Sequence, residues 1–202
     1  TIPGSIFPNK PSRLATRDYK TGKLTLNVGA LAGRRNVGAG VSNESYTLTE
    51  EPGKKVKVEA TFAGTDYSET YNGVESIAGD FGSGKDMLTL DDEFALPVDV
   101  KGGAGVDTLI VNNTTMPSGK LTKDTVGTIT YKKFSTLNIV LGNIDNTFTI
   151  ASTAKGTMTK IKTGGGNDTV YVQGTGGPTT VDTGQTGGGT VTIGTNLDKI
   201  KG

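Results

Sequence analysis

A short glycine corner followed at once by an alternating strand recurs along this chain, and it restricts the possible folds more than any other feature. The clearest copy runs from Gly164 to Val172, where three glycines and an Asn-Asp pair precede Thr-Val-Tyr-Val. Glycine takes positive φ values at no steric cost, so the corner can turn sharply. Side chains in the following strand alternate between its two faces. Similar stretches begin at Gly82 and Gly103, and weaker copies begin at Gly142 and Gly184.

The spacing of these corners predicts the architecture. The intervals from Gly82 to Gly103, from Gly142 to Gly164 and from Gly164 to Gly184 are nearly equal. Self-similarity at such a period is typical of a solenoid, in which each coil buries its apolar face against its neighbours. Alternation with period two predicts that the coils consist of β-strands and not of α-helices. We therefore expect an all-β parallel β-solenoid, like a β-helix or β-roll, with coils of about 20–22 residues and corners stacked along one edge.

The domain organisation follows from where the pattern fades. Residues 1–22 are predicted to be an N-terminal extended arm or cap, because Pro3, Pro8 and Pro11 disfavour ladder pairing. This arm either covers the first coil or offers a strand to a neighbouring subunit. Residues 23–202 are expected to form a single β-solenoid domain. A turn-rich loop insertion is expected near 112–127, and Leu197 and Ile200 are candidates to cover the last coil.

Composition argues against several classes of function. The chain has 31 glycines, a net charge of +1, and no histidine, cysteine or tryptophan. A charge near zero gives no bulk attraction for nucleic acid, and no apolar run is long enough to predict a membrane-spanning helix. Without histidine or cysteine, the chain lacks the commonest general base and the commonest zinc ligands. We therefore expect no catalysis, no nucleic-acid partner and no membrane span.

The corner motif resembles the Gly-Gly-x-Gly-x-Asp-x-hydrophobic-x repeat of the RTX, or hemolysin-type, calcium-binding family. In that family, glycine-loop carbonyls and aspartate carboxylates of stacked turns bind Ca²⁺, and a parallel β-roll forms. Residues 137–150 and 163–172 are also similar to repeats of very large bacterial surface and adhesin-like proteins. The resemblance implies an extracellular or cell-surface module whose partners are other copies of itself or neighbouring repeats of a longer chain.

The same resemblance implies a set of metal ligands. These are Asp86 stacked over Asp107, and Asp168 stacked over Asn146 or Asp145. Two oxygens from such pairs, together with corner carbonyls, suit the preference of Ca²⁺ for oxygen ligands. The chain departs from the family because it has only one corner per coil, and because an asparagine and a glycine replace two of the aspartates. The alternative is that each aspartate bonds the backbone of its own turn, as in Asx-turns.

The sequence is therefore consistent with two classes of function. The first is a non-catalytic structural or adhesive β-solenoid that self-associates into fibres or a surface layer and is stiffened by Ca²⁺, with cell-surface glycans as a further partner. The second is a polysaccharide-binding or polysaccharide-cleaving β-helix, for which the acidic run Asp91-Asp92-Glu93 is either a carboxylate pair or a solvated corner. The dipeptide Arg34-Arg35 is either a solvated loop or a contact for an anion or glycan.

Overall fold

The computed structural model describes residues 13–91, 94–184 and 188–194, and strands account for most of its regular structure. The strands are β1 (Ala15–Arg17), β2 (Lys23–Leu26), β3 (Ser45–Glu51), β4 (Lys55–Phe62), β5 (Thr65–Asn72), β6 (Ser76–Asp80), β7 (Ser83–Gly84), β8 (Met87–Asp91), β9 (Val98–Lys101), β10 (Ala104–Gly105), β11 (Thr108–Asn113), β12 (Ser118–Leu121), β13 (Thr125–Val126), β14 (Ile129–Lys132), β15 (Thr136–Leu141), β16 (Thr147–Ile150), β17 (Met158–Lys162), β18 (Thr169–Val172), β19 (Thr179–Asp182) and β20 (Thr190–Ile193). A 3-10 helix, η1, spans Gly29–Arg34.

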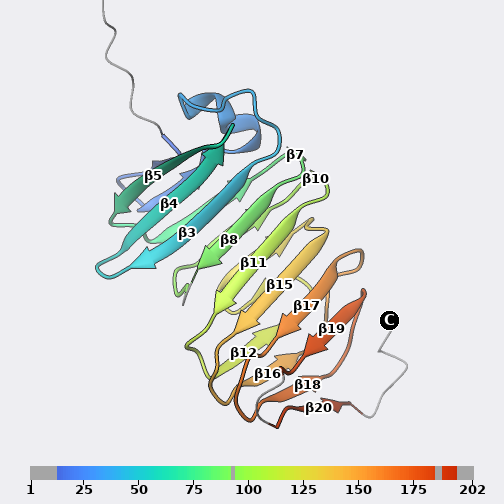
Figure 1. The fold of residues 1–202 in the computed structure, drawn as a ribbon. Helices are drawn as coiled ribbons and strands as arrows, with labels where there is room; N and C mark the ends of the chain where they lie inside the picture. The colour runs from blue at the N-terminus through green and yellow to red at the C-terminus, as the bar shows by residue number, and fades with distance from the viewer. Residues whose placement is uncertain (1–12, 92–93, 185–187, 195–202) are drawn as a thin grey trace, which may run out of the picture.

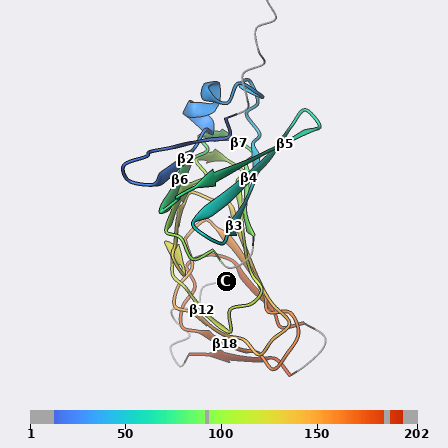
Figure 2. The same cartoon turned by 90° about the vertical axis from the view of Figure 1, so that its left-hand side faces the viewer.

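Two long sheets form an elongated molecule (Figure 1). A ten-stranded sheet has the order β1-β2-β6-β9-β14-β13-β12-β16-β18-β20, and an eight-stranded sheet has the order β19-β17-β15-β11-β8-β3-β4-β5. The small strands β7 and β10 pair separately. From β14 to β20 the chain enters the two sheets alternately, so each new strand lies beside the one that came two strands earlier, or beside an inserted hairpin. Figure 2 shows the sheets as two walls that run the length of the molecule.

The strand register repeats at the period expected from the corners. Leu88 pairs with Leu109 in the eight-stranded sheet, one predicted repeat further along the chain. In the ten-stranded sheet Phe148 pairs with Val170, and Val170 pairs with Val191, again one repeat apart in each case. These pairs are parallel and bring like residues into contact. The all-β class with parallel strands is therefore confirmed.

The expectation that all corners stack along one edge is wrong. The corners that begin at Gly82 and Gly103 lead into β8 and β11, which belong to the eight-stranded sheet. Those that begin at Gly142, Gly164 and Gly184 lead into β16, β18 and β20, which belong to the ten-stranded sheet. Because successive strands alternate between the two sheets, a glycine corner can lead into either sheet. The corners consequently form two columns.

Antiparallel hairpins interrupt the parallel ladders. At the N-terminal end, β3, β4 and β5 pair antiparallel, and β1 pairs antiparallel with β2. Of the predicted arm, residues 13–22 therefore include a strand of the ten-stranded sheet, whereas the prolines at 3, 8 and 11 lie outside the described residues. The segment 112–127 contains β12 and β13, which pair antiparallel within the same sheet. Leu197 and Ile200 also lie outside the described residues.

The space between the sheets is filled by one continuous apolar core. Its members come from the inward face of each strand, as the burial of alternate residues in β15 and β18 illustrates. Near the N-terminal end the core is aromatic, and Tyr46 packs edge-on against Phe62 and Phe81 with ring centroids 6.1 Å apart. Within the described ranges, no helix has the length and apolar character needed to cross a bilayer.

Candidate functional site

Three buried acids form a column in front of the eight-stranded sheet. Glu44, Asp86 and Asp107 immediately precede β3, β8 and β11, and the strand register places them one above another. The backbone N–H of Glu44 donates to Asp86 Oδ1 at 2.7 Å, and the N–H of Asp86 donates to Asp107 Oδ1 at 3.0 Å. Each of these two aspartates thus accepts the corner amide of the preceding coil. We call this column the acid ladder.

The backbone reinforces the acid ladder in the opposite direction. The carbonyl of Glu44 accepts the N–H of Met87, and the carbonyl of Asp86 accepts the N–H of Thr108, both at 2.8 Å. A buried backbone amide needs a partner, because leaving it unpaired costs about 1–3 kcal/mol. At a corner, where the sheet ladder is broken, the aspartate side chain supplies that partner. These bonds of Asp86 and Asp107 therefore run to the neighbouring corner, whereas an Asx-turn would bond the residue's own turn.

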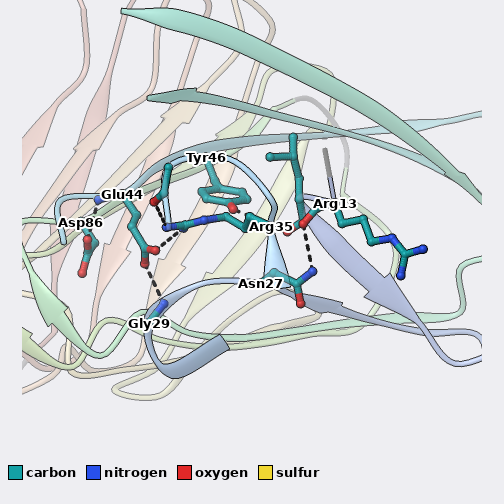
Figure 3. A network of polar contacts seen from close by, with 9 residues as sticks. Arg13, Asn27, Gly29, Arg35, Glu44, Tyr46 and Asp86 are labelled. Carbon is teal, nitrogen blue, oxygen red and sulfur yellow. Dashed lines mark hydrogen bonds and ion pairs between the residues drawn. The ribbon is translucent and has the colours of Figure 1, made fainter. Parts of the chain in front are cut away.

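The first rung of the acid ladder is an ion pair at the N-terminal end of the molecule (Figure 3). Glu44 accepts a hydrogen bond from the Arg35 guanidinium through Oε1, and from the Gly29 N–H through Oε2 at 2.8 Å. Arg35 is fully buried, donates to the Gly38 carbonyl at 2.5 Å, and lies 4.6 Å from the centre of the Phe62 ring. A dense polar cluster therefore closes this end of the acid ladder.

This ion pair corrects the interpretation of Arg34-Arg35. Arg34 is exposed, as a solvated loop predicts, but Arg35 is buried and neutralises Glu44. Neither a solvated loop nor a contact for an outside anion describes Arg35. Sequence reasoning also missed Glu44 as a member of the column. The available signal was the position of Glu44 directly before the alternating stretch 45–48, which matches the positions of Asp86 and Asp107 directly before theirs.

Burial alters the titration of two of these acids. The pKa of Asp86 is raised to about 6, mainly by burial and to a smaller extent by the charges of Glu44 and Asp107. Hydrogen bonding from the Glu44 N–H opposes this rise. Burial also raises the pKa of Glu44, against the effects of the Gly29 N–H and of Arg35. Asp86 and Asp107 each keep one buried oxygen, Oδ2, with no hydrogen-bond partner among the described residues.

Asn146 and Asp168 form a second column, which precedes β16 and β18 of the ten-stranded sheet, and we call it the amide ladder. The N–H of Asn146 donates to Asp168 Oδ1 at 3.0 Å, and the Thr163 hydroxyl donates to Asp168 Oδ2 at 2.5 Å. The carbonyl of Asp168 accepts the N–H of Thr190 at 2.8 Å. Both carboxylate oxygens of Asp168 are therefore engaged by the protein itself.

The side-chain amide of Asn146 occupies the centre of an oxygen cage. Its Nδ2 lies 3.0 Å from the Gly142 carbonyl, 2.6 Å from that of Ile144 and 3.3 Å from that of Thr163. A bound cation would need these same oxygens, and the amide N–H groups already point at them. In this orientation the amide of Asn146 occupies the oxygens that a cation would use, while its own Oδ1 has no hydrogen-bond partner among the described residues. Asp145, the alternative ligand, is exposed and accepts the N–H of Asn167 at 2.8 Å.

The remaining acidic candidates are scattered. Within the described parts of the chain, no three Asp, Glu, His or Cys side chains are grouped as a metal site would require. Asp91, at the end of β8, accepts a hydrogen bond from Asn112 Nδ2 at 2.9 Å. Asp92 and Glu93, the other members of the acidic run, lie outside the described residues. The chemistry that the described corners support is therefore mainly the satisfaction of backbone amides between coils.

Comparison with known proteins found no matching family model, no similar curated protein and no similar solved structure.

Proposed function

We propose that this chain is a rigid, non-catalytic β-solenoid module of an extracellular or cell-surface protein, with a structural or adhesive role. The observation that carries the proposal is the parallel register of both sheets, which advances by one repeat per coil at Leu88–Leu109, Phe148–Val170 and Val170–Val191. Coils that stack in this way make a stiff rod whose length grows with repeat number. Such a rod is suited to holding neighbouring parts of a surface protein at a fixed distance and to presenting them.

The use of the corner side chains supports the same role. In an enzyme, buried acids face a cleft in which a substrate can reach them. Here the acids of both ladders face the corner amides of neighbouring coils, and Arg35 neutralises the first of them. Their hydrogen bonds hold one coil against the next. We find no comparable support for the polysaccharide-cleaving alternative, and glycans enter only as a proposed adhesive partner.

The C-terminal end supports self-association or continuation into a further repeat. Strands β19 and β20 are the last members of the two sheets, so each presents an unpaired backbone edge among the described residues. On β20, the side chains of Val191 and Ile193 are 42% and 53% exposed. Open strand edges with apolar side chains are templates for pairing with another chain. We propose that a second copy, or a following repeat, covers this end.

Sedimentation velocity over a wide range of protein concentration tests the self-association. We expect the wild-type chain to form end-to-end oligomers, visible as rods in negative stain, because pairing would bury the β20 edge. The double variant V191K/I193K should stay monomeric. The control variant Met158→Lys, at an exposed position on the outer face of β17, should form oligomers as the wild type does. A wild-type protein that remains monomeric at every concentration would remove self-association from the proposal and leave only the rigid module.

Of the predicted calcium ligands, Asp86 and Asp107 are the pair that we retain for the proposed site. Among the described residues, the Oδ2 atoms of Asp86 and Asp107 have no hydrogen-bond partner, and the pKa of Asp86 is raised, so a cation beside them would relieve their repulsion. We propose that any Ca²⁺ bound by the described residues is held there, with corner carbonyls as further ligands. A ligand that binds only the folded state stabilises it by about 2.7 kcal/mol at a hundredfold excess over Kd.

Thermal melts in millimolar Ca²⁺ and in chelator check this proposal. We expect a melting temperature several degrees higher in Ca²⁺, and we expect Asp107→Asn to abolish the difference. Asp168→Asn is the matched control, because Asp168 has no free oxygen, and this variant should keep the response to Ca²⁺. Equal melting temperatures of the wild type in Ca²⁺ and in chelator would show that the corners have only a structural role and do not bind Ca²⁺.

A further inference from the structure

Lysines gather around a hollow on the surface of this protein, at the edge where the chain passes from the ten-stranded to the eight-stranded sheet. The hollow is open to solvent and has a volume of about 390 Å³. Its walls include parts of two corners and the tip of the β12–β13 hairpin. The lysines that line it are Lys123, Lys132, Lys133 and Lys155, and all of them are exposed.

Unequal corner lengths explain the hollow. Residues 133–135 alone connect β14 to β15, so this corner is short. The corners beside it are longer, because residues 102–107 lead from β9 to β11 and residues 151–157 lead from β16 to β17. A short corner between two longer ones leaves a recess, and Phe134 and Ser135 of the short corner line it.

Hydrogen bonds to neighbouring corners fix the backbone that carries these lysines. The carbonyl of Lys133 accepts the N–H of Gly103 at 3.1 Å. The N–H of Lys123 donates to Ser152 Oγ at 3.0 Å. Lys155 lies in a turn that a backbone hydrogen bond of 3.3 Å closes. A binding surface whose backbone is held in place before a ligand arrives loses less conformational entropy on binding.

The charges around the hollow are unbalanced. Asp124 also lines it, and its carboxylate lies 3.9 Å from Lys123 Nζ. Lys132, Lys133 and Lys155 form no ion pair with any residue that the structure describes. The hollow is therefore locally basic, although the whole chain has a net charge of only +1. An anionic partner would relieve the repulsion among these ammonium groups.

Lys133 has a backbone conformation that residues with a side chain rarely adopt. Its φ is +55°, in the left-handed region that glycine occupies without steric cost. Residues held in such conformations are concentrated at functional sites. At this position the chain has a lysine that lines the hollow, where a glycine would suit the backbone better.

The hollow continues onto the outer face of the ten-stranded sheet. A second hollow, of about 670 Å³, shares Lys132 and Lys133 with the first. Asp80, Asp99 and Lys101 also line it, and Lys101 forms an ion pair with Asp80 at 2.5 Å. We call the two hollows together the lysine groove. One part of the lysine groove is basic and the other is nearly balanced, so it suits a chain with widely spaced negative charges.

The lining of the lysine groove distinguishes between anionic polymers. Duplex DNA carries one charge per about 1.7 Å, and proteins bind single strands by stacking bases on aromatic rings. Tyr131 and Phe134 line the groove but are buried, so they offer no ring face for stacking. Asp99 and Asp124 would repel a densely charged polymer. A sugar chain that carries its carboxylates on separate rings meets less repulsion.

We propose that the lysine groove binds an acidic polysaccharide whose negative charges are the carboxylates of uronic acids, with Lys132, Lys133 and Lys155 as the charged contacts. The proposal rests on the adhesive role proposed above, and it names the class of glycan that this role would recognise.

Hexagalacturonate and its carboxyl-reduced counterpart provide a direct test, because the two oligosaccharides differ only in their carboxylates. Calorimetric and ligand-observed NMR titrations of the whole chain at low ionic strength should show saturable binding of hexagalacturonate and no binding of the reduced compound. Salt at about 0.3 M should weaken the binding, since it screens exposed charges beyond about 6 Å. Absence of saturable binding, or equal binding of the two compounds, would overturn the proposal. Tighter binding of a single-stranded oligonucleotide of equal charge would overturn it in favour of nucleic acid.

Two double variants that remove equal charge locate the site. K133Q/K155Q should weaken the binding of hexagalacturonate about tenfold, as expected for the loss of two exposed ion pairs. K160Q/K162Q is the matched control, because Lys160 and Lys162 are exposed on β17 and do not line the lysine groove. This control should bind as the wild type does. Equal weakening in both variants would mean that only the overall charge matters, and would overturn the proposal.

Thermal melts and sedimentation velocity of the same samples separate this proposal from the proposed function. A wild type that melts cooperatively but does not bind hexagalacturonate overturns the glycan site and leaves the rigid module in place. A wild type that binds hexagalacturonate but stays monomeric supports the glycan site and removes only self-association.

Discussion

At the scale of single residues, the acid ladder combines a favourable and an unfavourable effect. The carboxylates of Asp86 and Asp107 each accept a backbone N–H that the sheets cannot pair, which favours folding. The same arrangement brings Glu44, Asp86 and Asp107 together in the interior, where burial and mutual repulsion disfavour the charged form of Asp86. Arg35 compensates only Glu44 directly. The pKa of Asp86 is therefore raised.

The titration of Asp86 predicts a pH dependence of stability. Its pKa rises from 3.8 to about 6 on folding, so the folded state binds more protons than the unfolded chain between these values. The contribution of Asp86 to stability therefore decreases as the pH rises from about 4 to about 6, by on the order of 3 kcal/mol. Asp86→Asn keeps an oxygen for the Glu44 N–H and should lack this decrease.

Urea denaturation of wild type and Asp86→Asn at several pH values from about 4 to about 7 measures the difference between their free energies of unfolding. The difference should grow in favour of the variant as the pH rises through this window and then level off. Asp99→Asn, at an exposed position on β9, should follow the wild type. Parallel curves for wild type and Asp86→Asn would contradict the assignment.

Arg35 leads to a second prediction at this scale. Arg35→Met would leave the Glu44 carboxylate buried without its partner, and removal of one member of a buried ion pair typically costs about 3–5 kcal/mol. The double variant R35M/E44Q should recover part of that loss, because no buried charge is left at this position. Arg34→Met is the matched control at the exposed neighbouring position, with an expected change within about 0.5 kcal/mol. Chemical denaturation of the four proteins provides the comparison, and equal losses for Arg34→Met and Arg35→Met would contradict it.

At the scale of elements, the glycine corners allow neighbouring coils to approach one another closely. Gly103 has a φ of +118°, and a Cβ built there would lie 2.0 Å from the carbonyl oxygen of Gly82 in the preceding coil. The glycine is therefore required for two reasons, its backbone conformation and the absence of a side chain. Gly53, in the turn between β3 and β4, has a φ of +82°, but in the described part of the chain no heavy atom lies within 4 Å of its built Cβ.

Alanine substitution at these two glycines separates the two requirements. Gly53→Ala should cost about 1–2 kcal/mol, the usual penalty for a left-handed conformation of a residue with a side chain. Gly103→Ala should cost clearly more, because the added methyl group must also push one coil away from the next. The free energies of unfolding from urea titrations give both numbers. Equal costs would mean that close stacking at the corner contributes nothing.

At the scale of the whole molecule, the two ends differ. The N-terminal end carries antiparallel strands, the aromatic contacts of Tyr46 and the Arg35–Glu44 pair (Figures 1 and 3). At the other end, every residue of β20 is exposed, and Val181 of β19 is only half-buried. Each coil is stabilised mainly by its neighbours, so a coil with one neighbour is weaker than a coil with two. The rod should therefore open first at its C-terminal end.

Hydrogen exchange followed by mass spectrometry at low protein concentration tests this order. Amides in the ladder between β18 and β20 should exchange fastest among the parallel ladders, and those of β8, β11 and β15 should exchange slowest. Higher concentration should protect the C-terminal strands selectively if a second copy covers them. Uniform protection along both sheets would show that the rod unfolds as one unit.

The sequence by itself determined the repeat length, the positions of the strands around the strong corners and the pairing of like residues, because glycine conformation and period-two alternation are local properties. It also predicted that Asp86 neighbours Asp107 and that Asn146 neighbours Asp168, since each pair is separated by one repeat and therefore by one coil.

The tertiary structure alone decided that the corners form two columns, because the sheet to which a strand belongs depends on its partners and not on its own pattern. It likewise decided that Arg35 is buried against Glu44, and that the amide of Asn146 points at carbonyl oxygens. The physical reason is that burial and hydrogen bonding at a corner are set by neighbouring coils, whose residues are distant in the chain.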